Sequence, residues 1–285
     1  MRIDVALATC LTLPDPDEDT PPLLEALRAA GLRAEVLAWD DPNADFAGAT
    51  MTLLRSTWNY PERPDDFLAW ALRTAAASKL WNRPDVVRWN VYKGYLLDLE
   101  RRGVPVVPTE LVARGSGATL EAIATQRAWR DLVVKPAISA GSRGTARVRE
   151  DEMRGRGQDH LRALLRDGDA LVQPYVASVE GHGERSVVWI DGAITHSVRK
   201  SPRFPGDPES VSAALPVAAD EADVALRAIA AAPSPLLYAR VDMARDDRGA
   251  PRVMELELIE PSLFFPRCPA ALARYVDAVR RLLGP

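Results

Sequence analysis

The stretch Val253-Met254-Glu255-Leu256-Glu257-Leu258-Ile259-Glu260 is the most informative about the architecture when it is compared with the earlier stretch Tyr238-Ala239-Arg240-Val241-Asp242-Met243. Both are apolar runs of strand length that carry charged residues at every second position. The run Asp246-Asp247-Arg248-Gly249 between them is typical of a turn. We therefore expect a β-hairpin whose two strands are largely buried.

Acidic residues gather on one face of this predicted hairpin. Side chains alternate along a strand, so Arg240 and Asp242 share one face, and Glu255 and Glu257 share one face of the partner strand. Carboxylates in an apolar setting repel each other unless cations lie among them, and ligands that are all oxygen favour Mg²⁺ or Mn²⁺ over zinc. The pattern predicts a metal site formed by Asp242, Glu255 and Glu257. The alternatives are an edge strand with its acids in water and a structural salt bridge to Arg240.

Further upstream, an apolar strand over 132–135 ends in Lys135 and is followed by a loop rich in small residues. Such a loop allows backbone N–H groups to approach a phosphate while the ammonium supplies charge. The candidates in this loop are Ser139, Gly141, Ser142, Gly144 and Thr145. Lys93, near the start of a helix expected over 90–102, is a second candidate for a phosphate. The alternatives are solvated lysines and an ordinary hairpin, because the spacing is not that of a Walker motif.

A third segment suits a nucleoside. The strand expected over 170–176 ends in Gln173, Pro174, Tyr175 and Val176, whose main chain is able to face a purine. The following acids, Glu184 first and Glu180 second, are candidates for binding a ribose diol. A solvated acidic loop is the alternative.

The start of the chain follows the pattern of a parallel sheet. Strands expected over 3–8, 34–39 and 50–54 alternate with helices over 21–30 and 65–78. The middle of the chain has the elements of a small α+β module, and the remainder alternates strands and helices. We expect α/β and α+β architecture in three parts, namely an N-terminal sheet domain over 1–105, a small subdomain over 106–174 and a C-terminal subdomain over 175–285.

Composition excludes several classes of protein. The 285 residues carry a formal net charge of -4, so the chain has no global attraction for nucleic acid. No run is long and apolar enough for a membrane span or a signal peptide, and we expect no membrane partner. Cys10 and Cys268 show no metal-binding or redox spacing. We expect a cytoplasmic protein.

Together, the four features resemble the ATP-grasp superfamily, whose members close ATP between two α+β subdomains. The resemblance implies an ATP-grasp fold with an N-terminal pre-ATP-grasp domain, a lid over the middle segment and a C-terminal metal-binding subdomain. It implies that Lys93 and Lys135 bind the nucleotide, that 139–145 cover its phosphates, that 173–176 contact adenine and that Glu184 binds ribose. Asp242, Glu255 and Glu257 look like the metal ligands of the family, although many members have Asn where this sequence has Glu257.

A narrower resemblance rests on three phrases, Leu54-Arg55-Ser56-Thr57-Trp58-Asn59-Tyr60, His196-Ser197-Val198-Arg199-Lys200 and Glu260-Pro261-Ser262-Leu263-Phe264-Phe265. They are similar to the branch of the superfamily that contains the cycloserine-forming cyclo-ligase. The resemblance implies that arginines stabilise the transferring phosphoryl group, and we select Arg199 and Arg240 for this role.

The acceptor is expected beyond the carboxyl ends of the N-terminal strands. Two loops lie there, and Arg55 is a candidate for holding a carboxylate while Trp58 forms a wall of the pocket. His196 is considered as a base, although a structural role is the more common one for a histidine. The full set of substrate candidates is Thr9, Cys10, Arg55, Ser56, Thr57, Trp58, His196, Glu260 and Ser262.

The function expected from these features is an ATP-dependent ligase that forms a C–N bond through an acyl phosphate. Its substrate would be a small carboxylic or amino acid, its cofactors ATP and Mg²⁺ or Mn²⁺, and a homodimer is possible. One alternative is intramolecular ring closure of the cycloserine-forming type. Another is a regulatory module that binds a nucleotide without turnover.

Overall fold

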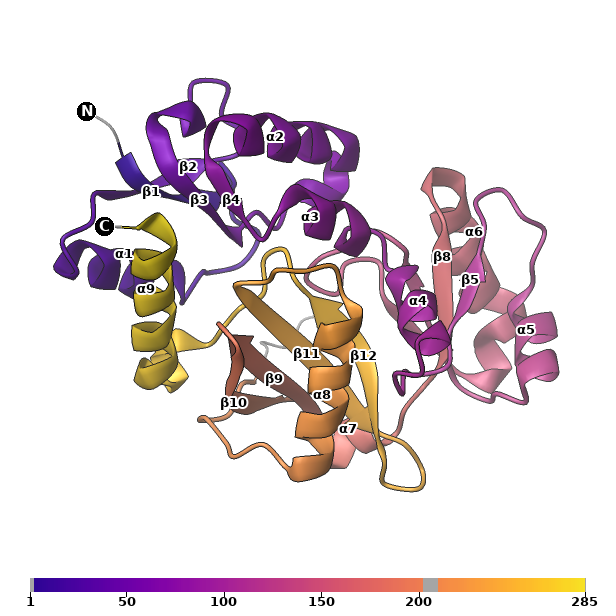
Figure 1. Cartoon of the computed structure of the whole chain (residues 1–285). Coiled ribbons are helices and arrows are strands. Elements are labelled where there is room, and N and C mark those ends of the chain that lie inside the picture. Colours follow the sequence, from indigo (N-terminus) through magenta and orange to yellow (C-terminus); the bar gives the residue numbers. More distant parts are fainter. Residues whose placement is uncertain (1–2, 202–209, 285) are drawn as a thin grey trace.

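The structure, a computed structural model, describes residues 3–201 and 210–284. These residues form three four-stranded sheets (Figure 1). One sheet is parallel and two are antiparallel, which is the combination of α/β and α+β architecture that the sequence predicts. The sheets meet around one large cavity, described below.

The N-terminal sheet has the order β2-β1-β3-β4, and all its strands run parallel. The strands are β1 (Ile3–Thr9), β2 (Ala34–Ala38), β3 (Ala49–Ser56) and β4 (Lys79–Trp81). The helices that connect them are α1 (Thr20–Ala29) and α2 (Pro64–Ala77), with short 3-10 turns at Phe46–Gly48 and Tyr60–Glu62. β1 and β3 are buried along most of their length because helices cover both faces of the sheet. The loops that follow the carboxyl ends of β1 and β3 reach the cavity, as in other parallel sheets.

The expectation of a single helix over 90–102 is wrong. The chain makes two helices, α3 (Pro84–Asn90) and α4 (Tyr95–Arg101), with Lys93 in the break between them. The break arises because polar groups here bond to distant segments. The N–H of Lys93 donates to the carbonyl of Ala137, and the Asn90 amide bonds to the backbone of residues 256 and 258.

The middle sheet has the order β5-β8-β6-β7 and is antiparallel. Its strands are β5 (Glu110–Val112), β6 (Leu132–Pro136), β7 (Ala146–Val148) and β8 (Ala170–Pro174). The helices α5 (Leu120–Arg127) and α6 (Gln158–Asp167) pack on one face around Leu120, Leu132 and Leu161. Short turns occupy Glu150–Glu152 and Met153–Gly157 before α6. β5 has three residues, too few for a periodic pattern to reveal it.

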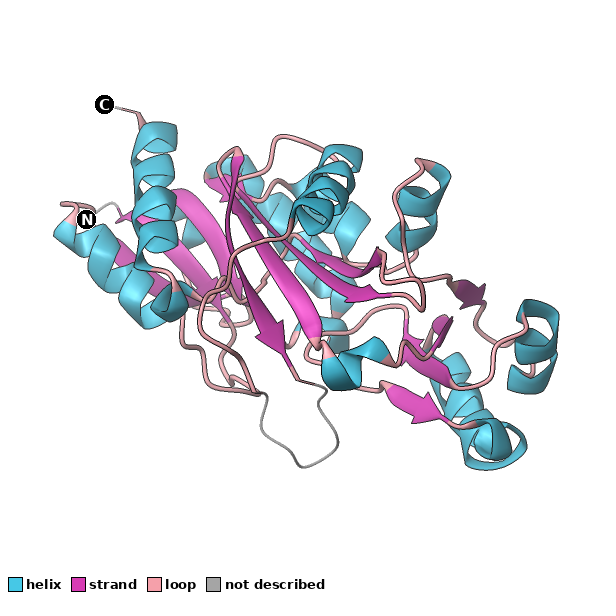
Figure 2. Cartoon of the chain, turned by 90° about the horizontal axis from the view of Figure 1, so that it is seen from below, coloured by secondary structure: helices cyan, strands magenta, loops and turns pink. Residues whose placement is uncertain are grey.

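The C-terminal sheet has the order β10-β9-β11-β12 and is also antiparallel. Its strands are β9 (Glu184–Ile190), β10 (Ala193–Lys200), β11 (Tyr238–Arg245) and β12 (Pro251–Glu257). The short helix α7 (Ser178–Gly181) precedes β9, and α8 (Ala219–Ala231) packs against β12, β11 and β9 (Figure 2). A 3-10 turn at Phe265–Arg267 leads into α9 (Pro269–Leu283), which lies beside α1 (Figure 1).

Two of the cores cross the expected boundaries. Tyr275 and Val279 of α9 pack with Val5 and Leu27 of the N-terminal layer, and Leu96 of α4 packs in the core of the C-terminal sheet. The division of the chain at residues 105 and 174 stays a prediction, although each sheet lies within one of the three parts. Within the described ranges, no helix has the length and apolar character needed to cross a membrane.

Candidate active site

The predicted hairpin forms, and its charged face lines a cavity of about 730 Å³. In the register of β11 and β12, Arg240 lies opposite Glu257 and Asp242 lies opposite Glu255. The loop from Asp246 to Ala250 closes the hairpin with backbone hydrogen bonds. β12 is an edge strand of its sheet, as the alternative has it, but its acids do not simply lie in water. All four side chains face the cavity, and Asp242 is 2% exposed.

Cations hold each of these carboxylates in place. Lys93 pairs with Glu255, and Arg240 pairs with both Asp242, at 2.8 Å, and Glu257. Lys200 lies 2.9 Å from the Asp242 carboxylate and 2.5 Å from that of Glu184. The structural salt bridge considered for Arg240 is thus present, and the same guanidinium lines the cavity.

The charge of these groups follows from burial and from their partners. Burial by itself would raise the pKa of Asp242, but Arg240 and Lys200 outweigh it and hold the pKa well below its usual range. Burial raises the pKa of Glu257 to about 7 despite the attraction of Arg240. Burial also lowers the pKa of Lys135, and Glu255 opposes this shift. The cavity therefore holds a cluster of buried and half-buried ionisable groups whose charges depend on one another.

The metal site stays a prediction. In the part of the chain that the structure describes, no three acidic, histidine or cysteine side chains stand together in a group that could hold a metal ion. The chemistry of the donors nevertheless fits a hard cation, since Asp242, Glu255 and Glu257 supply only carboxylate oxygens to the cavity. If a metal binds here, Lys93 and Arg240 have to release these oxygens toward it.

The loop after β6 reaches the cavity as expected. Lys135 is 8% exposed and faces the cavity together with Ser139, Gly141, Ser142 and Thr145. Gly144 does not line the cavity. A side chain there would lie 2.8 Å from Pro136, and its φ of +73° suits glycine, so Gly144 shapes the loop.

Arg143, which the sequence pattern does not single out, ties this loop to the N-terminal layer. It donates to the Trp58 carbonyl at 2.8 Å and to the Glu62 carboxylate at 2.7 Å.

The end of β8 and the start of β9 form the side of the cavity expected for the nucleoside. Gln173, Pro174, Tyr175 and Val176 line it. The cavity also has apolar lining residues that come from separate elements, so the sequence does not reveal them. They are Val107, Val133, Met254 and Leu256.

The two acids considered for the ribose lie in different places. Glu184 lines the cavity, whereas Glu180 lies outside the lining and bonds to the Tyr175 hydroxyl at 2.8 Å and to Arg147 at 2.7 Å. Of the two acids, Glu184 is thus the one that lines the cavity, and its contact with a ribose stays a prediction.

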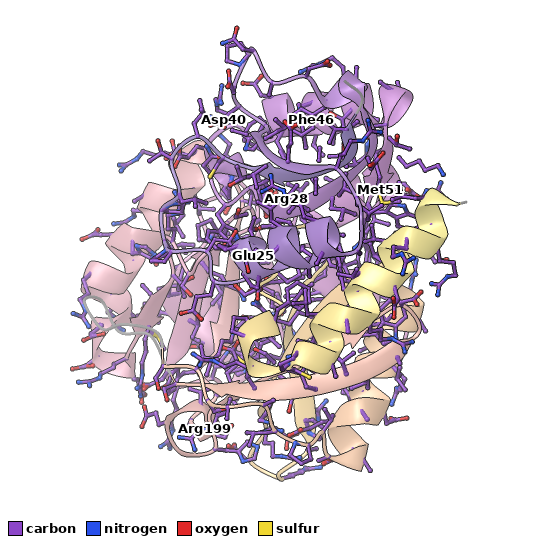
Figure 3. The ribbon with its side chains drawn as sticks, turned by 90° about the vertical axis from the view of Figure 1, so that its left-hand side faces the viewer. Glu25, Arg28, Asp40, Phe46, Met51 and Arg199 are labelled. Atoms are coloured by element: carbon purple, nitrogen blue, oxygen red, sulfur yellow. The ribbon has the colours of Figure 1, made fainter. Side chains whose placement is uncertain are left out.

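Arg199 does not point toward the carboxylates predicted to bind a metal, so the expectation for this arginine is wrong. Successive side chains of β10 point to opposite faces, so Arg199 is exposed while the next residue, Lys200, is buried and lines the cavity. Figure 3 shows Arg199 near the lower edge of the molecule, away from Asp40 and Phe46 of the N-terminal layer. The register could have identified Lys200, because it lies opposite Glu184 on β9.

Three of the substrate candidates, Trp58, Glu260 and Ser262, line the cavity. The other candidates from the two N-terminal loops do not. The hydroxyls of Thr9 and Ser56 bond to each other at 2.8 Å, the Cys10 thiol donates to the carbonyl of residue 12, and Thr57 is fully buried. His196 is buried outside the lining and bonds to the Thr195 hydroxyl; burial lowers its pKa to about 4.

Arg55 holds a carboxylate, but this carboxylate belongs to the protein. Arg55 is 3% exposed, lies 3.6 Å from Asp19 and donates to the Pro261 carbonyl at 3.0 Å. Asp19 in turn accepts the backbone N–H groups of Leu263, Phe264 and Phe265 at 2.5 to 3.1 Å. The pair fixes the segment that carries Glu260 and Ser262. No local pattern distinguishes Asp19 from its acidic neighbours, so the sequence alone does not reveal it.

Comparisons with known proteins agree with this geometry. Residues 5–82 match the family model described as the N-terminal domain of D-cycloserine synthetase DcsG. Over 284 residues, the chain is 34% identical to the cycloserine biosynthesis protein DcsG of Streptomyces lavendulae, covering 94% of this chain and 95% of that protein. The crystal structure of D-cycloserine synthetase DcsG superimposes with a TM-score of 0.90 at 34% identity, covering 98% and 99% of the two chains.

More distant structures share the fold. The ATP-grasp ligase PsnB complexed with its minimal precursor gives a TM-score of 0.67 at 19% identity, covering 97% of each chain. The D-alanine–D-alanine ligase from Bacillus anthracis complexed with ATP gives 0.68 at 14% identity, covering 97% of this chain and 96% of that one.

The three sheets and the cavity between them therefore define an ATP-grasp ligase, an enzyme that forms a carbon–nitrogen bond at the expense of ATP. The chain belongs to the family of the D-cycloserine synthetase DcsG, as the three sequence phrases suggest.

Proposed function

We propose that this enzyme transfers the γ-phosphoryl group of ATP to the carboxylate of a small acid and then joins the activated carbonyl to an amine. The observation that carries the proposal is that Lys93, Lys135 and the loop 139–145 share one cavity with the acids of the hairpin and with the end of the N-terminal sheet. One cavity of about 730 Å³ has room for a nucleotide and a small second ligand side by side.

In the first step, an oxygen of the substrate carboxylate attacks the γ-phosphorus, and the bond to the bridging oxygen of ADP breaks. Lys135, Lys93 and Arg240 place positive charge around the phosphates, where it stabilises the transferring group. In the second step, the amine attacks the acyl phosphate, phosphate leaves and the nitrogen loses a proton. The loop over 139–145, tied down through Arg143, keeps water away from the acyl phosphate.

We assign the divalent cation to Asp242, Glu255 and Glu257 and identify it as Mg²⁺, with Mn²⁺ as a substitute. When bound, such an ion would neutralise negative charge on the β- and γ-phosphates. The oxygen-only donors support this choice. Glu184 is assigned to the ribose and 173–176 to the adenine, supported by their place on one side of the cavity.

A second candidate reaction is ring closure within one molecule, in which the amine and the activated carbonyl belong to the same substrate. The observation that favours it is the similarity to D-cycloserine synthetase DcsG over nearly the whole chain. The substrate would then be a small amino acid derivative. A nucleotide-binding module without turnover is a weaker fit, because the cavity contains more charged groups than nucleotide binding requires.

We infer a cytoplasmic location, which the need for ATP supports. A homodimer stays a prediction that size-exclusion chromatography with light scattering would test.

The test combines binding and turnover. Isothermal titration with a non-hydrolysable ATP analogue and Mg²⁺ should give binding that weakens strongly in Lys135→Ala. A panel of small acids should include members that stimulate ADP release and that yield a hydroxamate when hydroxylamine traps the acyl phosphate. Binding that is indifferent to Lys135→Ala, or a panel without ADP release, would contradict the proposed reaction. Products that retain both reacting groups in one ring would identify cyclisation.

A further inference from the structure

Glu260 differs from the other buried acids of the cavity. It is 9% exposed and lines the cavity, yet across residues 3–201 and 210–284 no group forms a hydrogen bond or an ion pair with its carboxylate. Each of the others has a partner, since Asp242, Glu255 and Glu257 pair with lysine or arginine and Asp19 accepts backbone N–H groups. A buried carboxylate is costly unless a cation or a hydrogen-bond donor faces it.

The backbone that carries this carboxylate is held by several hydrogen bonds. The Trp58 indole N–H donates to the Glu260 carbonyl at 3.0 Å, and Arg55 donates to the next carbonyl, that of Pro261, also at 3.0 Å. Asp19 anchors the three residues from 263 to 265. The backbone of Glu260 is therefore held where the cavity meets the loop after β3, so only its side chain has to adjust when a ligand arrives.

Among the described residues, the cations near Glu260 already have other partners. Lys93 pairs with Glu255, and Arg240 pairs with Asp242 and Glu257. Trp58 and Tyr60 lie beside Glu260 in the cavity, and burial together with the nearby carboxylates of Glu257 and Glu255 raises its pKa to about 8. Aromatic faces and carboxylates together suit an organic cation, whose positive charge would favour the ionised form of Glu260. A metal ion would need several oxygen ligands.

On these grounds, we propose that Glu260 binds the ammonium group of an amino acid substrate and selects it against acids that lack a primary amine. The proposal rests on the proposed function, because it assigns the second ligand of the same cavity. The other charged end of this ligand, its carboxylate, would then point toward the lysines and the nucleotide phosphates. Glu260 thereby distinguishes substrates by charge before any chemistry occurs.

Matched pairs of acids test this assignment, with serine against glyceric acid and alanine against lactic acid, each as both enantiomers. For the wild-type enzyme, we expect the amine-bearing member to have a kcat/KM for ADP release roughly 100-fold above that of its hydroxy counterpart. Glu260→Gln should bring this ratio close to one, with partial recovery in Glu260→Asp. The KM for ATP and the dependence on Mg²⁺ should change by no more than about two-fold. A shift in the Mg²⁺ dependence instead would assign Glu260 to the metal and overturn the proposal.

A measurement without turnover separates this proposal from the proposed function. In the presence of AMPPNP and Mg²⁺, the amino acid should raise the melting temperature of the wild type and of the control Glu25→Gln, whose carboxylate is exposed on α1 (Figure 3). It should not do so for Glu260→Gln. If no amino acid raises the melting temperature more than its hydroxy counterpart, the proposal is overturned. If the shift occurs without ADP release, the proposed ligase reaction fails while the role of Glu260 stands.

The melting temperature without ligand tests whether the Glu260 carboxylate stabilises the fold. Because the Glu260 carboxylate has no partner within the described residues, Glu260→Gln should melt at the same temperature as the wild type or higher. A lower melting temperature would show that the carboxylate stabilises the fold and would count against the proposal.

Discussion

Asp19→Asn should destabilise the enzyme at a point far along the chain from the substitution. The carboxylate accepts three backbone N–H groups, from Leu263, Phe264 and Phe265, and is the counter-charge of the buried Arg55. In the variant, an NH₂ group replaces one oxygen, so at least one buried N–H loses its acceptor. The guanidinium also loses its charged partner.

The magnitude follows from these two losses. An orphaned buried donor costs about 1–3 kcal/mol, and breaking a buried ion pair costs about 3–5 kcal/mol when the contact is close. The separation of 3.6 Å between Arg55 and Asp19 is long, and the Arg55 contact with the Pro261 carbonyl persists. We therefore expect a total loss of about 3 kcal/mol. For a chain of this size, that corresponds to a melting temperature lower by roughly 6–12 °C.

Differential scanning calorimetry with and without AMPPNP measures this loss, and Glu18→Gln is the matched control. The Glu18 side chain is 69% exposed and lies 3.8 Å from Arg267, so its replacement should shift the melting temperature by less than about 2 °C. The reasoning is refuted if Asp19→Asn also melts within about 2 °C of the wild type. A second readout is the KM for the acid substrate, which should rise while that for ATP stays unchanged.

Three further predictions concern other parts of the molecule. Lys200→Met removes a cation shared by Glu184 and Asp242. Fluorescence titration should then show an affinity for ATP that is about ten-fold lower than that of the wild type. Arg143→Ala should leave the melting temperature within about 2 °C of the wild type, because its pair is exposed, but steady-state kinetics should show a higher KM for ATP. The pKa of His196, about 4 in the folded enzyme, lies below the ordinary value of 6.5, so stability present above pH 6.5 is lost as pH falls toward 4. Urea unfolding should show about 2 kcal/mol more loss between pH 7.5 and 5 in the wild type than in His196→Gln.

The sequence predicts most of the fold because its strong patterns are local. The strands of the hairpin around Asp246–Gly249 and the strand that contains Lys135 were predicted because each is a short apolar run of strand length. The break between α3 and α4 escaped prediction because its cause is non-local. Asn90 and Lys93 bond to residues 256, 258 and 137, and none of these contacts is visible in the local pattern.

The site was predictable where chemistry and strand period agree, as for Asp242, Glu255 and Glu257. The site was not predictable where side-chain orientation or contacts between distant segments determine which residue lines the cavity. Arg199 and Lys200 are adjacent and similar, and only the orientation of β10 decides which of them enters the cavity. Asp19 is one of several acids in a loop, and its role depends on backbone groups some 244 residues away.

The packing of α9 against α1 has a consequence for synthesis on the ribosome. Val5, Leu7, Leu23 and Leu27 are translated long before Tyr275, Val276 and Val279, which form part of their apolar cover. The face of the N-terminal sheet that α9 covers therefore stays exposed until α9 has been translated. At ordinary rates of about 5–20 residues per second, this delay lasts tens of seconds, during which aggregation competes with folding. Chaperones that bind exposed apolar segments would thus find a target in β1 and α1 until α9 packs against them.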